Sequence, residues 1–236
     1  APDPFIYMEV KGERLLVMSD LEMDRAKSQA SVDRVLSYSE LEKKAKSNGT
    51  KEPSTVDIVH VILREAKVRQ LLVPANFPFI HATRLQELGY SMKPKRDPFY
   101  EQRVVKTAEE VRSIEAAQRA TEEAVAAAHA TLKLATIRGG ELWLDGEVLT
   151  SERIKKLINV KLMERDCVAQ HTIVAGGEQA CDPHHEGTGP LPADRSIIFD
   201  VFPRSANSRY FADMSRTVIR GTASAELKRL YQTVKD

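Results

Sequence analysis

The stretch IIFDVFPRSANSRYFADMSRTVIRG, residues 197–221, raises the question that decides the fold. Apolar residues flank Asp200 and Asp213, and strand side chains alternate between two faces, so the pattern predicts two strands joined by the loop PRSANSR. In such a hairpin both acids point to the same side, and directly opposed residues have Cβ atoms about 5 Å apart. Two carboxylates at that spacing repel each other, so we expect a positive partner beside them.

Two interpretations of the acid pair stay open on spacing alone. The acids could sit in a bulge or pair with the hairpin's own arginines, Arg204, Arg209 and Arg216. They could instead help to hold two divalent cations, which lie about 3.5–4 Å apart in two-metal sites. Two ligands do not complete a metal site, so the second interpretation requires further ligands from elsewhere.

A histidine-containing segment, CDPHHEGTGPL, lies just upstream at residues 181–191. His184 or His185 could bind substrate or transfer a proton near neutral pH, although two solvated loop histidines also fit the segment taken alone. A zinc cluster that includes Cys181 would need a second Cys/His pair at finger spacing, and the sequence has none.

Composition argues against several classes of function. The 236 residues are 42% apolar and 29% charged, as in soluble globular proteins. Lys+Arg 35 against Asp+Glu 34 leaves a formal charge of +1, which argues against a nucleic-acid-binding surface. No apolar run is long enough to cross a membrane, and the first ten residues lack a signal-peptide pattern. Cys167 and Cys181 give no disulfide framework, and Cys167 and His171 are expected to be unrelated, so we expect a cytoplasmic protein with free thiols.

The sequence changes character near its middle. The first hundred residues alternate strand-like and helix-like segments, such as RLLVMSD followed by LEMDRAKSQ, which predicts a sheet covered by helices. The polar, proline-containing stretch SMKPKRDPFYEQR, residues 91–103, reads as a linker. The expected domains are therefore residues 1–102 and residues 103–236.

Capping-box patterns mark the starts of three expected helices, because a Ser or Thr side chain and a Glu three residues later satisfy N–H groups left free there. The last pattern opens the longest helix, TAEEVRSIEAAQRATEEAVAAAHATLKLA, which a glycine pair ends, and a further helix is expected from Ser151. The capping pairs are Ser19 and Glu22, Ser37 and Glu40, and Thr107 and Glu110.

Three segments share their patterns with one family of enzymes. They are RVVKTAEEVRSIEAAQRATEEAV, then ACDPHHEGTGPLPADRSIIFDVFP, then YFADMSRTVIRG with its D-x-S/T-R-T pattern, which is the most specific. Together they resemble the aminopeptidase P / prolidase family of metallopeptidases, over nearly the whole chain but more loosely in its first hundred residues. The resemblance implies an α/β N-terminal domain like that of creatinase, followed by the first half of an α+β pita-bread catalytic domain.

The resemblance also implies roles for four residues. Asp200 binds one metal ion and Asp213 bridges two, while His184 and His185 lie near the substrate, with His184 as the catalytic histidine. Creatinases keep the fold without these carboxylates, so both acids favour the metal-dependent branch. The implied cofactors are two divalent ions, Mn²⁺ in preference to Co²⁺ or Zn²⁺.

The activity implied for the intact protein is hydrolysis of peptides with proline next to the N-terminal residue, by an Xaa-Pro aminopeptidase or dipeptidase that forms a homodimer. The alternative is a non-catalytic protein-binding module with the same fold. Peptide is the expected partner, and neither nucleic acid nor membrane is expected to bind.

Two departures from the family pattern stand out. The family's first metal strand runs D-x-G, where this sequence has DVFP, and the loop between the aspartates is slightly longer than usual. The family's remaining metal ligands, one His and two Glu, lie well beyond the second strand, whereas the sequence stops at Asp236. We therefore expect a segment of a longer protein that by itself neither retains two metal ions nor acts on peptides.

Overall fold

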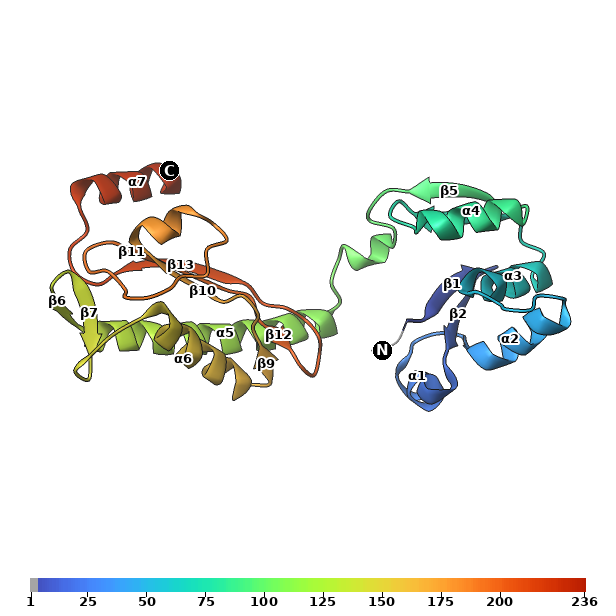
Figure 1. Cartoon of the computed structure of the whole chain (residues 1–236), viewed down its shortest axis with the longest axis horizontal. Helices are drawn as coiled ribbons and strands as arrows, with labels where there is room; N and C mark the ends of the chain where they lie inside the picture. Colours follow the sequence, from blue (N-terminus) through green and yellow to red (C-terminus); the bar gives the residue numbers. More distant parts are fainter. Residues whose placement is uncertain (1–3) are drawn as a thin grey trace. The chain divides into compact units, whose positions relative to one another are not determined.

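The computed structural model describes residues 4–236 and divides the chain into two compact units. The first unit ends at Val104 and the second begins at Val105. Figure 1 draws both, and each is described by itself. Within residues 4–236, no helix is both long and apolar enough to cross a membrane.

Two small sheets form the frame of the first unit. Strands β1 (Ile6–Val10), β2 (Glu13–Met18) and β3 (Arg34–Ser37) lie in that order, with β1 antiparallel and β3 parallel to β2. Strands β4 (Gln70–Pro74) and β5 (Ser91–Lys95) pair in parallel. The parallel pairings need helical crossovers, which agrees with the predicted alternation of strands and helices.

Helices cover these sheets. The helix α3 (Thr55–Glu65) packs on both sides, because Ile58 and Ile62 belong to a core with β1 and β2, while Leu63 joins a second core with α4 (Phe79–Glu87). The Ser37 hydroxyl accepts from the backbone N–H of Glu40, which confirms that capping prediction. The elements are η1 (Asp20–Glu22), α1 (Met23–Gln29), α2 (Tyr38–Ser47), α3 (Thr55–Glu65), α4 (Phe79–Glu87) and η2 (Glu101–Arg103).

The capping prediction at Ser19 is wrong. The chain first makes the 3₁₀ turn η1, and Ser19 forms no side-chain cap bond, so its hydroxyl is buried without a partner. The helix α1 starts only after this turn. A 3₁₀ turn closes on i→i+3 bonds, so it moves the residue at which the α-helix begins.

The predicted linker also needs correction, because it begins with a strand. The segment SMKPK forms β5 and pairs with β4, where Pro94 lies opposite Val73. Proline cannot donate to a ladder and is tolerated on edge strands, and β5 pairs on one side only within residues 4–236. Proline and lysine are uncommon in strands, so the sequence pattern did not predict this strand.

The second unit starts with the long helix α5 (Ala108–Leu134). Its predicted capping box is confirmed, since Thr107 Oγ1 accepts from the Glu110 N–H and the Glu110 carboxylate accepts from the Thr107 N–H. A three-stranded sheet follows, and the next helix, α6 (Ser151–Met163), starts where the sequence predicts, with Thr150 as its N-cap. The strands of that sheet are β6 (Thr136–Arg138), β7 (Glu141–Leu144) and β8 (Glu147–Val148).

The sheet that carries the acid pair has the order β10-β11-β13, with antiparallel neighbours. Its strands are β10 (Ile173–Gly176), β11 (Ser196–Val201) and β13 (Met214–Ile219). The short strands β9 (Cys167–Val168) and β12 (Arg204–Ser205) pair with each other. Between β10 and β11 the chain makes the 3₁₀ turn η3 (Gly177–Cys181).

One face of this sheet is closed by α5 and α6, which lie together below it in Figure 1. Ile197, Phe199 and Val201 of β11 are fully buried in that core, while the residues between them are only partly buried. The His129 ring of α5 meets the Phe199 ring edge to face, with 5.1 Å between their centroids. The alternation of β11 therefore turns Asp200 to the opposite face.

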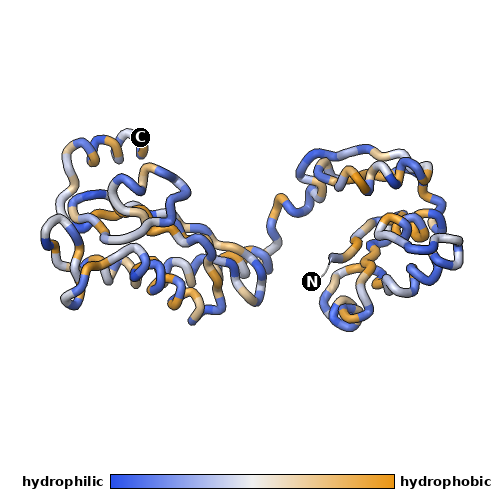
Figure 2. Tube along the Cα trace, viewed as in Figure 1, coloured by the Kyte–Doolittle hydropathy of each residue, from blue (hydrophilic) through white to orange (hydrophobic). Residues whose placement is uncertain are grey.

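The last helix is α7 (Ala225–Lys235), and none of its residues is buried. Figure 2 shows hydrophobic and hydrophilic positions alternating along the helices, α7 included. Its apolar residues Leu230, Tyr231 and Val234 are exposed. Helical spacing places them on one side of the helix.

Candidate metal centre

The hairpin brings the two predicted acids to the same face but not directly opposite one another. Asp200 pairs with Ser215 in the ladder, and Asp213 lies one residue before β13 begins. The expected opposition is therefore wrong by two positions. Because side chains alternate with a period of two, a shift of two keeps both carboxylates on the same side.

The turn at the end of the hairpin explains this register. Arg204 faces Phe211 across an isolated bridge, and the Ser205 N–H donates to the Tyr210 carbonyl. The turn is thus centred between Asn207 and Ser208 and sets the pairing of every residue behind it. The loop sequence alone did not reveal that centre, because several of its polar residues suit a turn.

The two carboxylates lie close enough to influence each other. Asp213 is exposed as a residue, yet partial desolvation of its carboxyl group, the negative charge of Asp200 and a hydrogen bond between the two carboxyl groups all raise its pKa. Asp200 itself is partly buried in the middle strand, between Ile173 of β10 and Ser215 of β13. Ser215 Oγ donates to Asp200 Oδ1 across 2.5 Å.

The hairpin's arginines interact elsewhere. Arg204 donates to the Arg209 carbonyl and lies over the Phe211 ring, and Arg216 donates to the Ser215 carbonyl. Within residues 4–236, no ion pair joins Asp200 or Asp213 to a basic side chain. The interpretation in which arginine neutralises the pair is therefore wrong for this structure.

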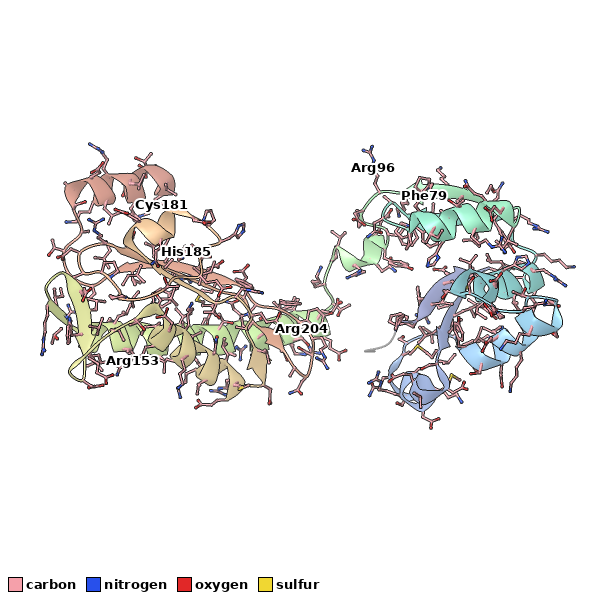
Figure 3. The ribbon with its side chains drawn as sticks, viewed as in Figure 1. Phe79, Arg96, Arg153, Cys181, His185 and Arg204 are labelled. Carbon is pink, nitrogen blue, oxygen red and sulfur yellow. The ribbon has the colours of Figure 1, made fainter. Side chains whose placement is uncertain are left out.

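The histidine segment forms a tight loop between η3 and β11. The His184 N–H donates to Asp182 Oδ1, which holds the turn, and the His184 residue is exposed. His185 is partly buried, and its Nδ1 accepts from the Gly187 N–H at 2.9 Å. Its neutral ring therefore carries the proton on Nε2, which is left to act as a donor. Figure 3 labels His185 and Cys181 in this part of the unit.

Gly187 fixes where this loop lies. Its φ of +81° belongs to the left-handed region, and a Cβ there would stand 1.8 Å from the Val174 carbonyl oxygen of β10. Only glycine allows the loop to approach the strand so closely. The Val174 N–H in turn donates to the Glu186 carbonyl, which ties the loop to the sheet edge.

The structure does not gather the histidines and the acids into one cluster. In the part of the chain that is described, no three His, Cys, Asp or Glu side chains are placed to hold a metal ion. Cys181 and its neighbours, considered above as a zinc cluster, are therefore not placed to share one ion. Cys167 is buried in β9 and His171 Nδ1 meets Glu186 Oε1 at 2.7 Å, so the ring nitrogen of His171 interacts with a carboxylate, although both residues line the same cavity.

A cavity of about 570 Å³ lies along α6, and neither acid of the pair nor His184 or His185 lines it. Four of its polar residues contact one another in pairs, since Thr172 donates to Asn159 and His171 Nδ1 meets Glu186 Oε1, while Lys155 donates to the Gly187 carbonyl outside the lining. Sequence reasoning missed these contacts because they join residues that are distant along the chain. The cavity adds no ligand to the acid pair.

Comparison with known proteins identifies the family. Residues 112–236, slightly more than half of the chain, match Metallopeptidase family M24. The chain therefore belongs to this family, and the match includes both acids and the histidine segment. A comparison with curated protein sequences found no match.

Solved structures with the same fold include three peptidases. An Xaa-Pro dipeptidase from Bacillus anthracis aligns with a TM-score of 0.76 at 15% identity, over 99% of this chain and 59% of its own. The prolidase from Pyrococcus furiosus aligns with 0.69 at 17% identity, over 96% and 59%. The X-Pro aminopeptidase from Thermotoga maritima MSB8 aligns with 0.69 at 20% identity, over 98% and 58%.

These similarities bear out the predicted architecture. The chain combines the N-terminal α/β domain with the first half of the pita-bread domain of these enzymes. It spans about 59% of the length of the first two structures. At such low identity the structural likeness concerns the fold alone.

Proposed function

We propose that this chain contributes part of the active site of a metal-dependent peptidase that cleaves peptides with proline next to the N-terminal residue. The observation that carries the proposal is the acid pair: two neighbouring carboxylates on the same face of the sheet, to which no basic side chain of residues 4–236 forms an ion pair. Membership of a metallopeptidase family supports it, and so do solved relatives described as Xaa-Pro dipeptidase, prolidase and X-Pro aminopeptidase.

The donor set of the pair fits divalent ions. Carboxylate oxygens suit Mn²⁺, Mg²⁺ and Ca²⁺ better than softer ions, which is why we favour Mn²⁺ over Co²⁺ or Zn²⁺. Desolvation first and the charge of Asp200 second raise the pKa of Asp213, and a bound cation would offset both effects. Asp200 would bind one ion and Asp213 would bridge two. When bound, such ions supply Lewis-acid activation of water and of the peptide carbonyl.

The chain's own residues would bind and orient the peptide. The exposed His184 ring can reach a substrate above the open face, where it would orient the scissile group or stabilise the charge that develops on it. The Nε2–H of His185 can donate a hydrogen bond, because its Nδ1 is already held by Gly187. We further propose that the complete protein is a cytoplasmic homodimer.

The test uses the complete gene product, purified without chelator. Its metal content is measured first, and Mn²⁺ and an Xaa-Pro peptide are then added. We expect cleavage before proline, and we expect Asp213→Ala to abolish it. Absence of cleavage, or full activity after Asp213→Ala, would refute the peptidase proposal. Absence of cleavage together with tight binding of another protein would favour the non-catalytic binding module.

A further inference from the structure

Ser215 occupies a special position beside the acid pair. It faces Asp200 directly in the ladder between β11 and β13, and its hydroxyl donates to Asp200 Oδ1 across 2.5 Å. It also lies two residues from Asp213, on the same face of the hairpin. A hydroxyl is therefore placed where the two carboxylates come together.

The hydrogen bond restricts how the Asp200 carboxylate can turn. A serine hydroxyl has one proton to donate, and an ionised carboxylate only accepts, so the bond fixes one oxygen and leaves the other free. Without this bond, two like charges would tend to rotate away from each other. Ile173, on the other side of Asp200, is apolar and offers no alternative side-chain donor.

We propose that Ser215 is a positioning residue that holds the Asp200 carboxylate in the orientation needed to share a divalent cation with Asp213. The inference rests on the proposed function, since it assigns Ser215 a role toward the ion that Asp200 and Asp213 would bind. Ligating carboxylates are commonly oriented by such outer hydrogen bonds, and losing one typically weakens metal binding about 10–100-fold.

Two variants that are isosteric with each other isolate the hydroxyl from the shape of the side chain. Ser215→Thr and Ser215→Val both add a branch at Cβ and suit a strand, but Thr keeps the hydroxyl where Val has a methyl group. Thr217→Ala is the matched control, because Thr217 lies on the same face of β13 but opposite Ile198 rather than an acid. Thermal unfolding of each variant checks that the fold is intact.

The measurement is a titration of the ¹⁵N-labelled chain with Mn²⁺ alone. Paramagnetic broadening of amide signals reports even weak binding, so it suits a chain that supplies only part of a ligand set. For the wild type we expect broadening centred on Asp200 and Asp213. Ser215→Val should need about ten-fold more Mn²⁺ for the same broadening. Ser215→Thr and Thr217→Ala should follow the wild type.

The outcomes separate this inference from the proposed function. If Mn²⁺ leaves the signals of Asp200 and Asp213 unchanged in the wild type, the metal site fails and the inference fails with it. If the wild type responds but Ser215→Val responds equally, the metal site stands and the positioning role is wrong. The positioning role is also wrong if Ser215→Thr weakens binding as much as Ser215→Val does.

Discussion

The N-terminal end of α3 and the β11–β13 hairpin each hold a carboxylate in a constrained place, and the two carboxylates behave in opposite ways. At Asp57, burial alone would raise the pKa, but hydrogen bonds from the Ser54 hydroxyl and N–H outweigh it, so the pKa is lowered. At Asp213 the pKa is raised, by burial first and by Asp200 second.

The difference lies in what the surroundings offer each charge. Ser54 and Asp57 form a complete capping box, so the charge of Asp57 is satisfied inside the fold. Asp213 lies beside another acid, Asp200, whose charge raises its pKa further. The two pKa shifts thus distinguish Asp57, whose charge stabilises the fold, from Asp213, whose charge a bound ligand would stabilise.

The largest expected effect tests whether the closed face of the sheet carries its stability. Phe199→Ala removes a fully buried ring that packs on α5, and we expect a loss of about 3–5 kcal/mol. Denaturant unfolding followed by fluorescence of Trp143, the protein's single tryptophan, measures it in the second unit. Phe211→Ala is the control, because Phe211 is 60% exposed and should cost far less. Equal losses would contradict the assignment of the two faces.

Next comes the loop that carries the histidines. Gly187→Ala would place a Cβ against the Val174 carbonyl, so we expect a loss of roughly 1–3 kcal/mol and a displaced His185. Gly189→Ala shares the left-handed backbone, with φ +69°, but meets nothing within 4 Å. The Gly189→Ala variant therefore measures the cost of backbone strain without the clash. If the two variants lose the same stability, the close approach to β10 does not matter.

The Asp57 side of the comparison predicts a smaller, pH-dependent effect. Asp57→Ala removes the capping box, at a cost of about 1 kcal/mol at pH 7. The pKa of Asp57 is lower in the folded state than in the unfolded state. Its charge therefore contributes fully to stability when the pH is above the unfolded-state pKa, about 3.9. That contribution is lost as the pH falls through the folded-state pKa.

Hydrogen exchange of the α3 amides, measured from pH 7 down to about pH 2, would therefore show the difference between wild type and Asp57→Ala shrink only below about pH 3.9. Asp24→Ala is the matched control, an exposed acid in the first turn of α1. A difference that instead grew on acidification would reverse the assigned sign.

The smallest expected effect has the opposite sign. In metal-free protein, Asp213→Asn removes one of two repelling charges, so it should stabilise the second unit by roughly 0.2–1 kcal/mol. A double-mutant cycle with Asp200→Asn isolates the interaction between the two carboxylates. A cycle without coupling, or a destabilised Asp213→Asn, would show that the acids do not repel each other.

Sequence patterns anticipated the elements wherever the deciding contacts are local. The capping box at Thr107 and the cap at Ser37 involve residues three positions apart, and both formed. The box at Ser54 was missed because its third residue is Asp57 rather than a glutamate. Ser19 had the right pattern but formed no cap, because a 3₁₀ turn follows it instead of the α-helix. A local pattern therefore shows which capping bonds are possible, and the conformation of the neighbouring backbone decides which of them form.

The candidate site was predictable in part for the same reason. Alternation along the strands placed Asp200 and Asp213 on one face, and the resemblance of three segments to one family assigned them a shared role. The contact between Ser215 and Asp200 was not predictable, because it depends on the register of two strands. The links of Glu186 and Gly187 to β10 likewise join segments about a dozen residues apart.

What the sequence by itself determined is most of the helices and the face on which the acids lie, since helical caps and strand alternation depend on neighbours within a few residues. The tertiary structure decided which residues meet: Ser215 opposite Asp200, the arginines turned to carbonyl groups, and the histidine loop against β10. Those choices depend on the turn of the hairpin and the packing of the sheet, which involve contacts between segments that only folding brings together.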